Sequence, residues 1–399
     1  MTPEFRRSWL GISTTAVALV CAVISPTVGA DEPVDAKTPI ETKKPVEINS
    51  PEQLKSLIDG SVDSAISFLK NRGQADDGRF SPESGIAVTA LCVRAILDHR
   101  PTEVNSPQVR KALDVILANV RGDGGIYSPA SKYRNYETSV AVSALVAAND
   151  DNRFESELKR AEVFLKRMQW DEGEGIESSD ESYGGAGYAK HGRPDLSNTS
   201  YMLDALRDLG NDAEDEAIQK ALRFVSRTQN LNGHGNDTEF AGKQGDGGFY
   251  YTPAAGGESK VVVEGDPENQ GGLRSYGSMT YAGLKSMIYA GLTRDDPRVA
   301  AAMGFIQRTY SLTHNPGMGQ QGLYYYYHTF AKALDVADIR ILTDTQGVNH
   351  QWNRELAATL LAAQQEDGSW VNHGHQRWME GDRNLVTAYA LLALAHCRE

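Results

Sequence analysis

The sequence predicts an all-α fold built from six helical hairpins, and three observations carry that prediction. A turn rich in Gly and Asp recurs six times between two helix-like segments, and internal repetition of this kind defines an array of helical pairs. The segments before the turns carry apolar residues at three- and four-residue steps, which gives each helix one buried stripe. The segments after the turns are apolar over most of their surface. We therefore expect an outer layer of amphipathic helices and an inner layer of buried ones.

The repeated turns divide the chain into its elements. They read QADDGRF (74–80), RGDGGIY (121–127), SYGGAGY (182–188), QGDGGFY (244–250), GQQGLYY (319–325) and QQEDGSW (364–370). Glycine permits the positive φ values of a sharp reversal, and Asp before Gly bonds to free backbone N–H groups. The first helices are expected at 62–72, 111–121, 161–170, 221–229, 303–310 and 355–365. The second helices are expected at 85–97, 138–148, 198–209, 278–292, 328–334 and 385–395. Strands should be scarce, with 247–253 and 259–265 the best candidates.

Composition and net charge limit the classes of partner that the protein can bind. The 399 residues carry a formal net charge of −13, and nucleic acid is not expected as a partner because phosphate binding needs a basic surface. The repeats fill nearly all of the chain after its N-terminus, so we expect one repeat domain at 51–399, acting as a monomer.

The N-terminus has the pattern of an export signal. Arg6 and Arg7 precede an apolar stretch, and Val28-Gly29-Ala30 is typical of a small-residue cleavage site. We therefore predict a signal peptide at 1–30 and an exported protein, periplasmic or extracellular. Residues 31–50 alternate Pro, Lys, Asp and Glu, which is typical of a disordered linker.

The repeats resemble a known family. QQEDGSW at 364–370 resembles the Gln–Trp repeat of squalene–hopene and oxidosqualene cyclases, and GDGGF at 245–249 and TAYALLAL at 387–394 are also typical of them. The protein prenyltransferase β subunits share this architecture. The resemblance covers all six repeats. It implies that the hairpins close into an α/α toroid with a central cavity, but a fold does not by itself transfer an activity.

The segments that carry chemistry in these families differ here. The cyclases place an acidic DxDD cluster at the start of an inner helix; the matching segment is Asp195-Leu196-Ser197-Asn198, which keeps only the first acid. A Ser hydroxyl is too weak an acid to protonate a polyene. The prenyltransferases hold zinc with an Asp, a Cys and a His. His328 matches that His, while Tyr276-Gly277-Ser278 stands where Asp-Gly-Cys is expected. One remaining ligand does not make a zinc site, so we expect no metal and no other cofactor.

Tyrosines and polar residues before the inner helices are the candidate site residues. Tyr324 to His328 run together before the expected fifth inner helix. Aromatic faces stabilise cations, stack on sugars or simply pack between helices. A His at a cavity mouth can serve as an acid or base, or can bond to the backbone. The residues assigned to catalysis are His328, Tyr327, Asp195 and Glu137, and those assigned to ligand binding are Tyr276, Ser278, Asn198 and Tyr324.

Three functional hypotheses remain open from the sequence. The first is an exported squalene-cyclase-like protein that takes a small apolar or isoprenoid ligand in its central cavity, with any reaction run by the residues above. The second is a non-catalytic ligand-binding module that kept the toroid. The third is a polysaccharide-active α/α-toroid enzyme with a glycan ligand, for which Arg134, Arg193 or Arg274 would bind a carboxylate.

Overall fold

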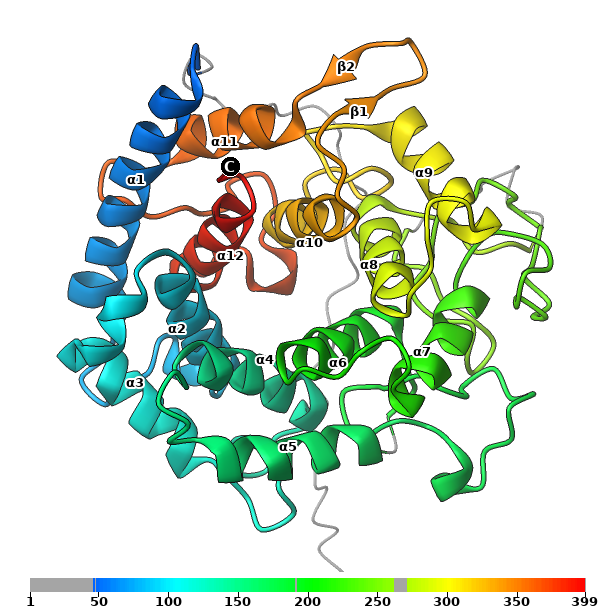
Figure 1. Ribbon diagram of the computed structural model, residues 1–399, viewed down its shortest axis with the longest axis horizontal. Helices are drawn as coiled ribbons and strands as arrows, with labels where there is room; N and C mark the ends of the chain where they lie inside the picture. The colour runs from blue at the N-terminus through cyan, green and yellow to red at the C-terminus, as the bar shows by residue number, and fades with distance from the viewer. Residues whose placement is uncertain (1–45, 47, 191, 262–270, 399) are drawn as a thin grey trace, which may run out of the picture. The chain divides into compact units, whose positions relative to one another are not determined.

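The computed structural model describes residues 46, 48–190, 192–261 and 271–398. The predicted signal peptide, most of the predicted linker and part of the second strand candidate lie outside these residues. The described part that belongs to the unit Lys37–Glu399 is a ring of paired helices. Figure 1 looks down the ring and shows an inner circle of helices surrounded by an outer one.

Helices of the two circles alternate along the chain. The outer helices are α1 (Pro51–Phe68), α3 (Pro107–Ala118), α5 (Glu155–Arg167), α7 (Glu216–Arg227), α9 (Pro297–Thr309) and α11 (Trp352–Ala363). The inner helices are α2 (Ala87–His99), α4 (Arg134–Ala147), α6 (Leu196–Asp208), α8 (Gly277–Tyr289), α10 (Leu323–Val336) and α12 (Arg383–Ala395). The all-α toroid of six hairpins predicted from the sequence is therefore confirmed. The only sheet in the described residues is the antiparallel pair β1 (Leu342–Thr343) and β2 (Asn349–His350), not the predicted strand at 247–253.

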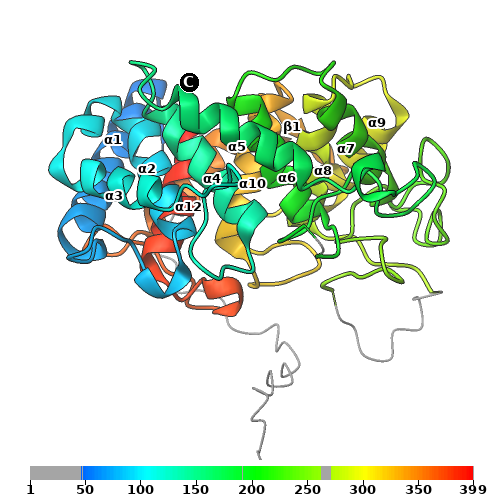
Figure 2. The same cartoon turned by 90° about the horizontal axis from the view of Figure 1, so that it is seen from below.

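Short helices fill several connections. They are the π-helical η1 (Leu69–Gly73) and the 3₁₀ turns η2 (Pro82–Ser84), η3 (Pro101–Asn105), η4 (Glu172–Glu174) and η5 (Arg377–Met379). Seen from the side, the inner and outer helices lie at the same height in the ring (Figure 2).

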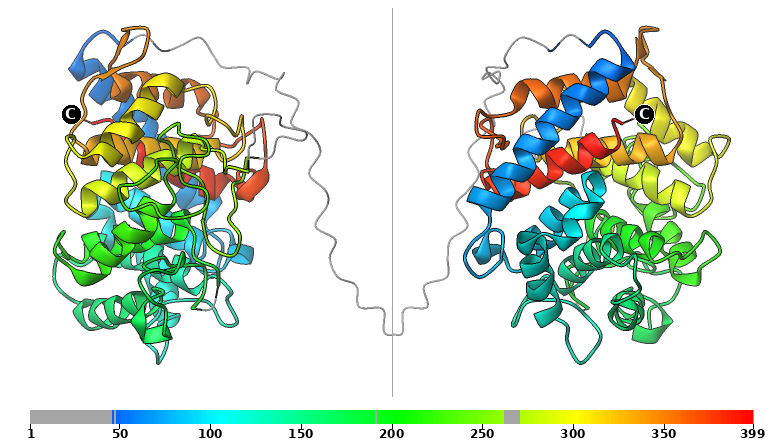
Figure 3. Two further views of the ribbon diagram at one scale, coloured as in Figure 1. Left: turned by 90° about the vertical axis from the view of Figure 1, so that its right-hand side faces the viewer. Right: turned by 60° about the vertical axis from the view of Figure 1, so that its left-hand side comes forward.

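The ring closes where its first and last repeats meet. Helix α12 packs against α2, and α11 packs against α1, which lies beside it in both views of Figure 3. Hydrogen bonds from a glutamine at the end of an outer helix join successive repeats, and the same bonds join the last repeat to the first. The glutamine side-chain amide donates to a carbonyl in its own turn and to a carbonyl in the next outer helix, at 2.8–2.9 Å in every case. These residues are Gln74, Gln169, Gln229 and Gln364.

A threonine in the inner helix fixes each turn from the other side. In five repeats its hydroxyl accepts a hydrogen bond of 3.0–3.1 Å from a backbone N–H of the turn. These residues are Thr89, Thr138, Thr199, Thr280 and Thr387. In the fifth hairpin Thr329 bonds instead to the carbonyl oxygens of Tyr325 and Tyr326 in its own helix.

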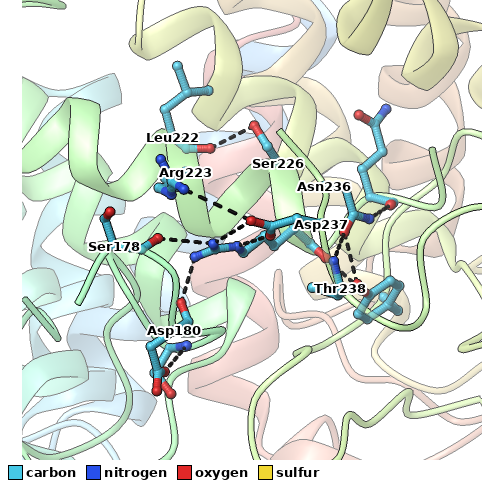
Figure 4. A network of polar contacts seen from close by, with 12 residues as sticks. Ser178, Asp180, Leu222, Arg223, Ser226, Asn236, Asp237 and Thr238 are labelled. Carbon is cyan, nitrogen blue, oxygen red and sulfur yellow. Dashed lines mark hydrogen bonds and ion pairs between the residues drawn. The ribbon is translucent and has the colours of Figure 1, made fainter. Parts of the chain in front are cut away.

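Two long loops bring further residues to the inner helices, and Arg227 at the end of α7 holds both. Its guanidinium is fully buried and donates to the carboxylate of Asp237 at 2.6 and 3.0 Å. The same group donates to the carbonyl oxygens of Asp180 and Ser178 at 2.6 and 3.0 Å. Figure 4 shows Ser178 and Asp180 approaching from one loop and Asp237 from the other. A buried cation needs such a complete set of acceptors, so the two loops are fixed relative to each other.

Candidate functional site

A cavity of about 1140 Å³ opens at the end of the ring where the inner helices begin. Every inner helix contributes residues from its first two turns, among them Val88, Glu137, Asn198, Ser278, Tyr325 and Leu385. The cavity is larger than the ~300–1,000 Å³ of ordinary small-molecule pockets. Because six helix N-termini face it, backbone N–H groups give this end a positive potential, which nearby acidic side chains offset.

Four tyrosines that meet across the ring line the cavity. Tyr136, Tyr201, Tyr325 and Tyr389 come from four different inner helices and all line it. The ring centroids of Tyr136 and Tyr201 lie 4.9 Å apart edge to face, and those of Tyr201 and Tyr325 lie 6.1 Å apart. The hydroxyls of Tyr201 and Tyr389 are hydrogen bonded at 3.3 Å. Burial raises the pKa of all four phenols, so each stays a neutral aromatic surface.

A hydrogen bond between Ser197 and Tyr325 joins α6 to α10 across the cavity. The Ser197 side chain, in the first turn of α6, is hydrogen bonded to the Tyr325 hydroxyl at 3.1 Å, and both residues line the cavity. The sequence could not pair them because 128 residues separate them in the chain.

Asp195 and Asn198 form a buried polar corner at the start of α6. The Asp195 carboxylate accepts hydrogen bonds from the backbone N–H of Asn198 at 2.9 Å and from its side-chain amide at 2.8 Å. Burial raises the pKa of Asp195 to about 6, against hydrogen bonds from Asn198 and Tyr251 that lower it. Asn198 lines the cavity, whereas Asp195 lies behind it as the N-cap of the helix.

Glu137 is a second buried carboxyl at the cavity. It lies in the first turn of α4 and accepts a hydrogen bond of 2.6 Å from the backbone N–H of Ser128. Burial raises its pKa, and hydrogen bonds from Ser128 and Ser131 oppose that rise. The segment before α2 packs closely against Glu137, because a Cβ added at Gly85 would meet a carboxylate oxygen of Glu137.

Glu380 is a cavity-lining acid that the site prediction did not include. One carboxylate oxygen accepts from the backbone N–H groups of Tyr324 and Tyr325, both at 2.9 Å, and so caps α10. The other accepts from the side chain of Asn372 at 2.6 Å. Burial raises its pKa to about 7 in spite of these donors. The loop before α12 that carries Glu380 holds none of the family motifs, so no motif in the sequence marked it as a site residue.

The remaining predicted residues divide into two groups. Tyr276 and Ser278 line the cavity at the start of α8. Tyr324, Tyr327 and His328 are buried and are not among its lining residues. The tyrosine run lies within α10 rather than before it, so successive side chains point in different directions.

Tyr327 and His328 have structural neighbours that account for their burial. The Tyr327 hydroxyl donates to the carbonyl oxygen of Leu312 at 2.6 Å. The His328 ring is stacked on Tyr389 with centroids 5.8 Å apart. Burial, followed by the nearby cations Lys332 and Lys285, lowers the pKa of His328 well below its ordinary value. The catalytic roles predicted for these two residues remain predictions.

Charged side chains cross the ring beyond the tyrosines. Asp204 of α6 accepts hydrogen bonds from Lys285 of α8 on Oδ2 and from Tyr289 on Oδ1, the latter at 3.1 Å. The Lys332 ammonium of α10 lies 2.8 Å from the same Oδ1. The two cations hold the pKa of Asp204 well below its usual range against the effect of burial. This cluster fills the deeper part of the inner ring and ties three helices together.

Neither a metal cluster nor a membrane-spanning helix is found in the described ranges. Within 46, 48–190, 192–261 and 271–398 there is no group of three His, Cys, Asp or Glu side chains suited to a metal ion. Within the same residues, no helix is both long enough and apolar enough to cross a bilayer.

Comparison with known proteins agrees with this architecture. Residues 60–253 match the family model of the squalene-hopene cyclase C-terminal domain. This segment of the chain is therefore similar to that domain. No curated protein matches the chain.

Solved structures share its fold at low identity. A variant of the type II terpene cyclase MstE from Scytonema, in complex with geranylgeranyl dihydroxybenzoate as substrate, is 12% identical with a TM-score of 0.51. The match covers 87% of the present chain and 99% of the MstE chain. Another MstE variant, in complex with the product merosterolic acid A, is 12% identical over 86% of this chain and 98% of its own, with a TM-score of 0.49.

Proposed function

We propose that this protein binds an apolar, isoprenoid-type ligand in its central cavity and does so without the acid-initiated cyclisation of the cyclases. The observation that carries the proposal is the tyrosine surface formed by Tyr136, Tyr201, Tyr325 and Tyr389 in a cavity of about 1140 Å³. Ring faces and the apolar side chains of Val88, Met279 and Leu385 favour a flexible hydrocarbon, whose burial is driven by the hydrophobic effect.

The hydrogen bonding of the site favours binding over proton transfer. At the position where the cyclases are expected to carry their acid stands Ser197, whose hydroxyl is far too weakly acidic to protonate an alkene. The carboxylates of Asp195 and Glu380 accept hydrogen bonds from backbone N–H groups that they cap. Glu137 is engaged in the same way with Ser128. These acids organise the cavity wall.

Retention of an isoprenoid tests the proposal. The purified protein is incubated with squalene, separated from free lipid by gel filtration, extracted and analysed by gas chromatography–mass spectrometry. We expect unchanged squalene in the protein fraction. Met279→Trp, which fills the cavity, should abolish retention, whereas Val163→Trp on the exposed face of α5 should not. Absence of squalene would contradict the proposed ligand, and a cyclic product would contradict the non-catalytic role.

The mouth of the cavity supports a second candidate, a glycan ligand. Tyr133 and Tyr188 lie edge to face with centroids 5.0 Å apart, and Trp378 is also exposed at the rim. Exposed aromatic rings of this kind can stack on sugars. Three results together would favour this candidate. Soluble oligosaccharides would bind with micromolar affinity, they would displace no squalene, and the Tyr133→Ala variant would no longer bind them.

We also propose export of the protein, with removal of residues 1–30. Support comes from the charged start, apolar stretch and small-residue site of the N-terminal sequence. N-terminal sequencing of the protein recovered outside the cytoplasm is expected to begin at Asp31. A chain recovered with its N-terminus intact would contradict cleavage.

A further inference from the structure

Asn198 presents a buried acceptor that the protein leaves unused. Only 1% of this residue is exposed, and its Oδ1 atom has no hydrogen-bond partner among the described residues. Its N–H groups are engaged, because the backbone N–H and the side-chain amide both donate to Asp195, and the side chain also interacts with the Tyr188 phenol. Its backbone carbonyl accepts from the Asn135 side chain. The side-chain bond to Asp195 also fixes the orientation of the amide, since a flipped side chain would direct its carbonyl at a carboxylate.

A buried acceptor without a donor costs free energy, and it therefore points to a group that arrives with the ligand. Asn198 lines the cavity together with Tyr276 and Ser278, so a ligand in the cavity lies against this residue. Its Oδ1 atom has almost no accessible surface, so the side chain must shift slightly for a ligand group to bond to it. The matching group must be a donor. A hydroxyl fits this requirement, whereas a pure hydrocarbon leaves Oδ1 unsatisfied.

The charges around this corner argue against an anionic head group. Asp195 lies directly behind Asn198. Burial raises the pKa of Asp195, and Lys260, which lines the cavity, is among the groups that oppose this rise. Lys260 is bound to Glu258 and lies 4.2 Å from the centroid of the Tyr251 ring. Arg193 also pairs with Glu258. Arg79 and Lys132 also line the cavity, but neither is among the groups with the largest effects on the pKa of Asp195. A diphosphate would therefore meet a carboxylate and cations that are already neutralised, and its own desolvation would not be repaid.

From this combination we infer that the natural ligand is an isoprenoid alcohol, with its hydroxyl donating to Asn198 Oδ1 and its hydrocarbon chain lying on the tyrosine surface. The inference rests on the proposed function and adds the chemical class of the head group to it. The apolar lining and the fold do not distinguish an alcohol from a hydrocarbon. The unsatisfied side-chain carbonyl of Asn198 does, because only the alcohol can donate to it.

A matched set of probes tests the head group. Dissociation constants of the purified protein are measured by isothermal titration for geranylgeraniol, for the hydrocarbon in which a methyl group replaces its hydroxyl, and for geranylgeranyl diphosphate. We expect the alcohol to bind at least about tenfold more tightly than either of the others, the usual effect of satisfying one buried polar group. Asn198→Leu should remove the preference for the alcohol while the hydrocarbon still binds.

The outcomes separate this inference from the proposed function. Asn71→Leu, the same substitution on the exposed surface near the end of α1, should keep the wild-type ratio. Equal binding of alcohol and hydrocarbon by the wild-type protein would overturn the inference and leave the proposed function standing. Tightest binding of the diphosphate would overturn it as well. Binding of none of the three probes would contradict the proposed function itself. Because the wild-type ratio decides, the test holds even where Asn198→Leu does not fold.

Discussion

The side-chain amide of Gln364 donates to the carbonyl oxygen of Ser61 at 2.9 Å, and this bond joins the last turn of the chain to its first outer helix. The two residues are 303 positions apart. The same amide also donates to Gly368 within its own turn at 2.8 Å. The link equals those that Gln74, Gln169 and Gln229 make between neighbours, so the ring closes with the contact that builds it.

Loss of this closing bond should destabilise the ring. Gln364→Ala leaves two carbonyl oxygens without their donor, and we expect the free energy of unfolding to fall by about 1–3 kcal/mol. Urea unfolding followed by circular dichroism measures it. Gln365→Ala is the matched control, because the Gln365 side chain bonds only locally to Ala363 at 3.2 Å and should cost less than ~0.5 kcal/mol. Equal losses in the two variants would contradict a closing role for Gln364.

The glycine of the third turn should be the least replaceable residue of its repeat. Gly184 has a φ of 83°, and an added Cβ would overlap the carbonyl oxygen of Lys220 in α7. Gly210 has a φ of 90° and open space around it, so it isolates the backbone effect. We expect Gly210→Ala to cost about 1–2 kcal/mol and Gly184→Ala at least ~3 kcal/mol. Thermal unfolding of both variants checks the order, and a similar cost for the two would show that the helix can move away.

Asp204 should be required for stability because two cations depend on it. In Asp204→Asn the side chains of Lys285 and Lys332 lose the carboxylate that both contact directly, and breaking a buried pair in this way costs about 3–5 kcal/mol. Glu155→Gln removes the exposed pair with Lys159 and should change the free energy of unfolding by less than ~1 kcal/mol. A loss below 1 kcal/mol in Asp204→Asn would mean that solvent reaches the cluster.

The repeat architecture was readable from the sequence because it is written in local patterns. Helical periodicity and the turns at 74–80 and 364–370 specify each hairpin, and the Gln–Trp resemblance specifies closure. The repeats and the family resemblance together placed Tyr276, Ser278, Glu137 and Asn198 at the beginnings of inner helices, and all four line the cavity.

The sequence did not predict where the inner helix of the fifth hairpin begins, nor which residues its side chains contact. Helix α10 begins at Leu323, five residues before the predicted start, because Glu380 from a loop 55 or more positions away caps its N–H groups. With that extra turn Tyr324 and Tyr327 lie within the helix, where their rings pack edge to face and the Tyr327 hydroxyl donates to the loop carbonyl of Leu312. The orphaned carbonyl of Asn198 depends on side-chain geometry, which no local pattern encodes.

Glu380 makes the strongest prediction about pH. Its pKa of about 7 in the folded protein lies above the ordinary 4.5, so the native state binds more protons than the unfolded state between those values. Its contribution to stability is therefore complete below pH ~4.5 and is lost as the pH rises through 7, by about 3 kcal/mol. In Glu380→Gln the side chain cannot ionise, yet its carbonyl oxygen can still accept from the N–H groups of Tyr324 and Tyr325.

Urea unfolding of the wild-type protein and of Glu380→Gln at pH 5, 6, 7 and 8 isolates this group, because every other titration is common to both. We expect the variant to gain stability relative to the wild type as the pH rises, with most of the gain between pH 5 and 7. Glu366→Gln, the same substitution at an exposed turn residue, should follow the wild type throughout. A constant difference between the wild type and Glu380→Gln would mean that the three donors around Glu380 outweigh its burial and keep it ionised at every pH tested.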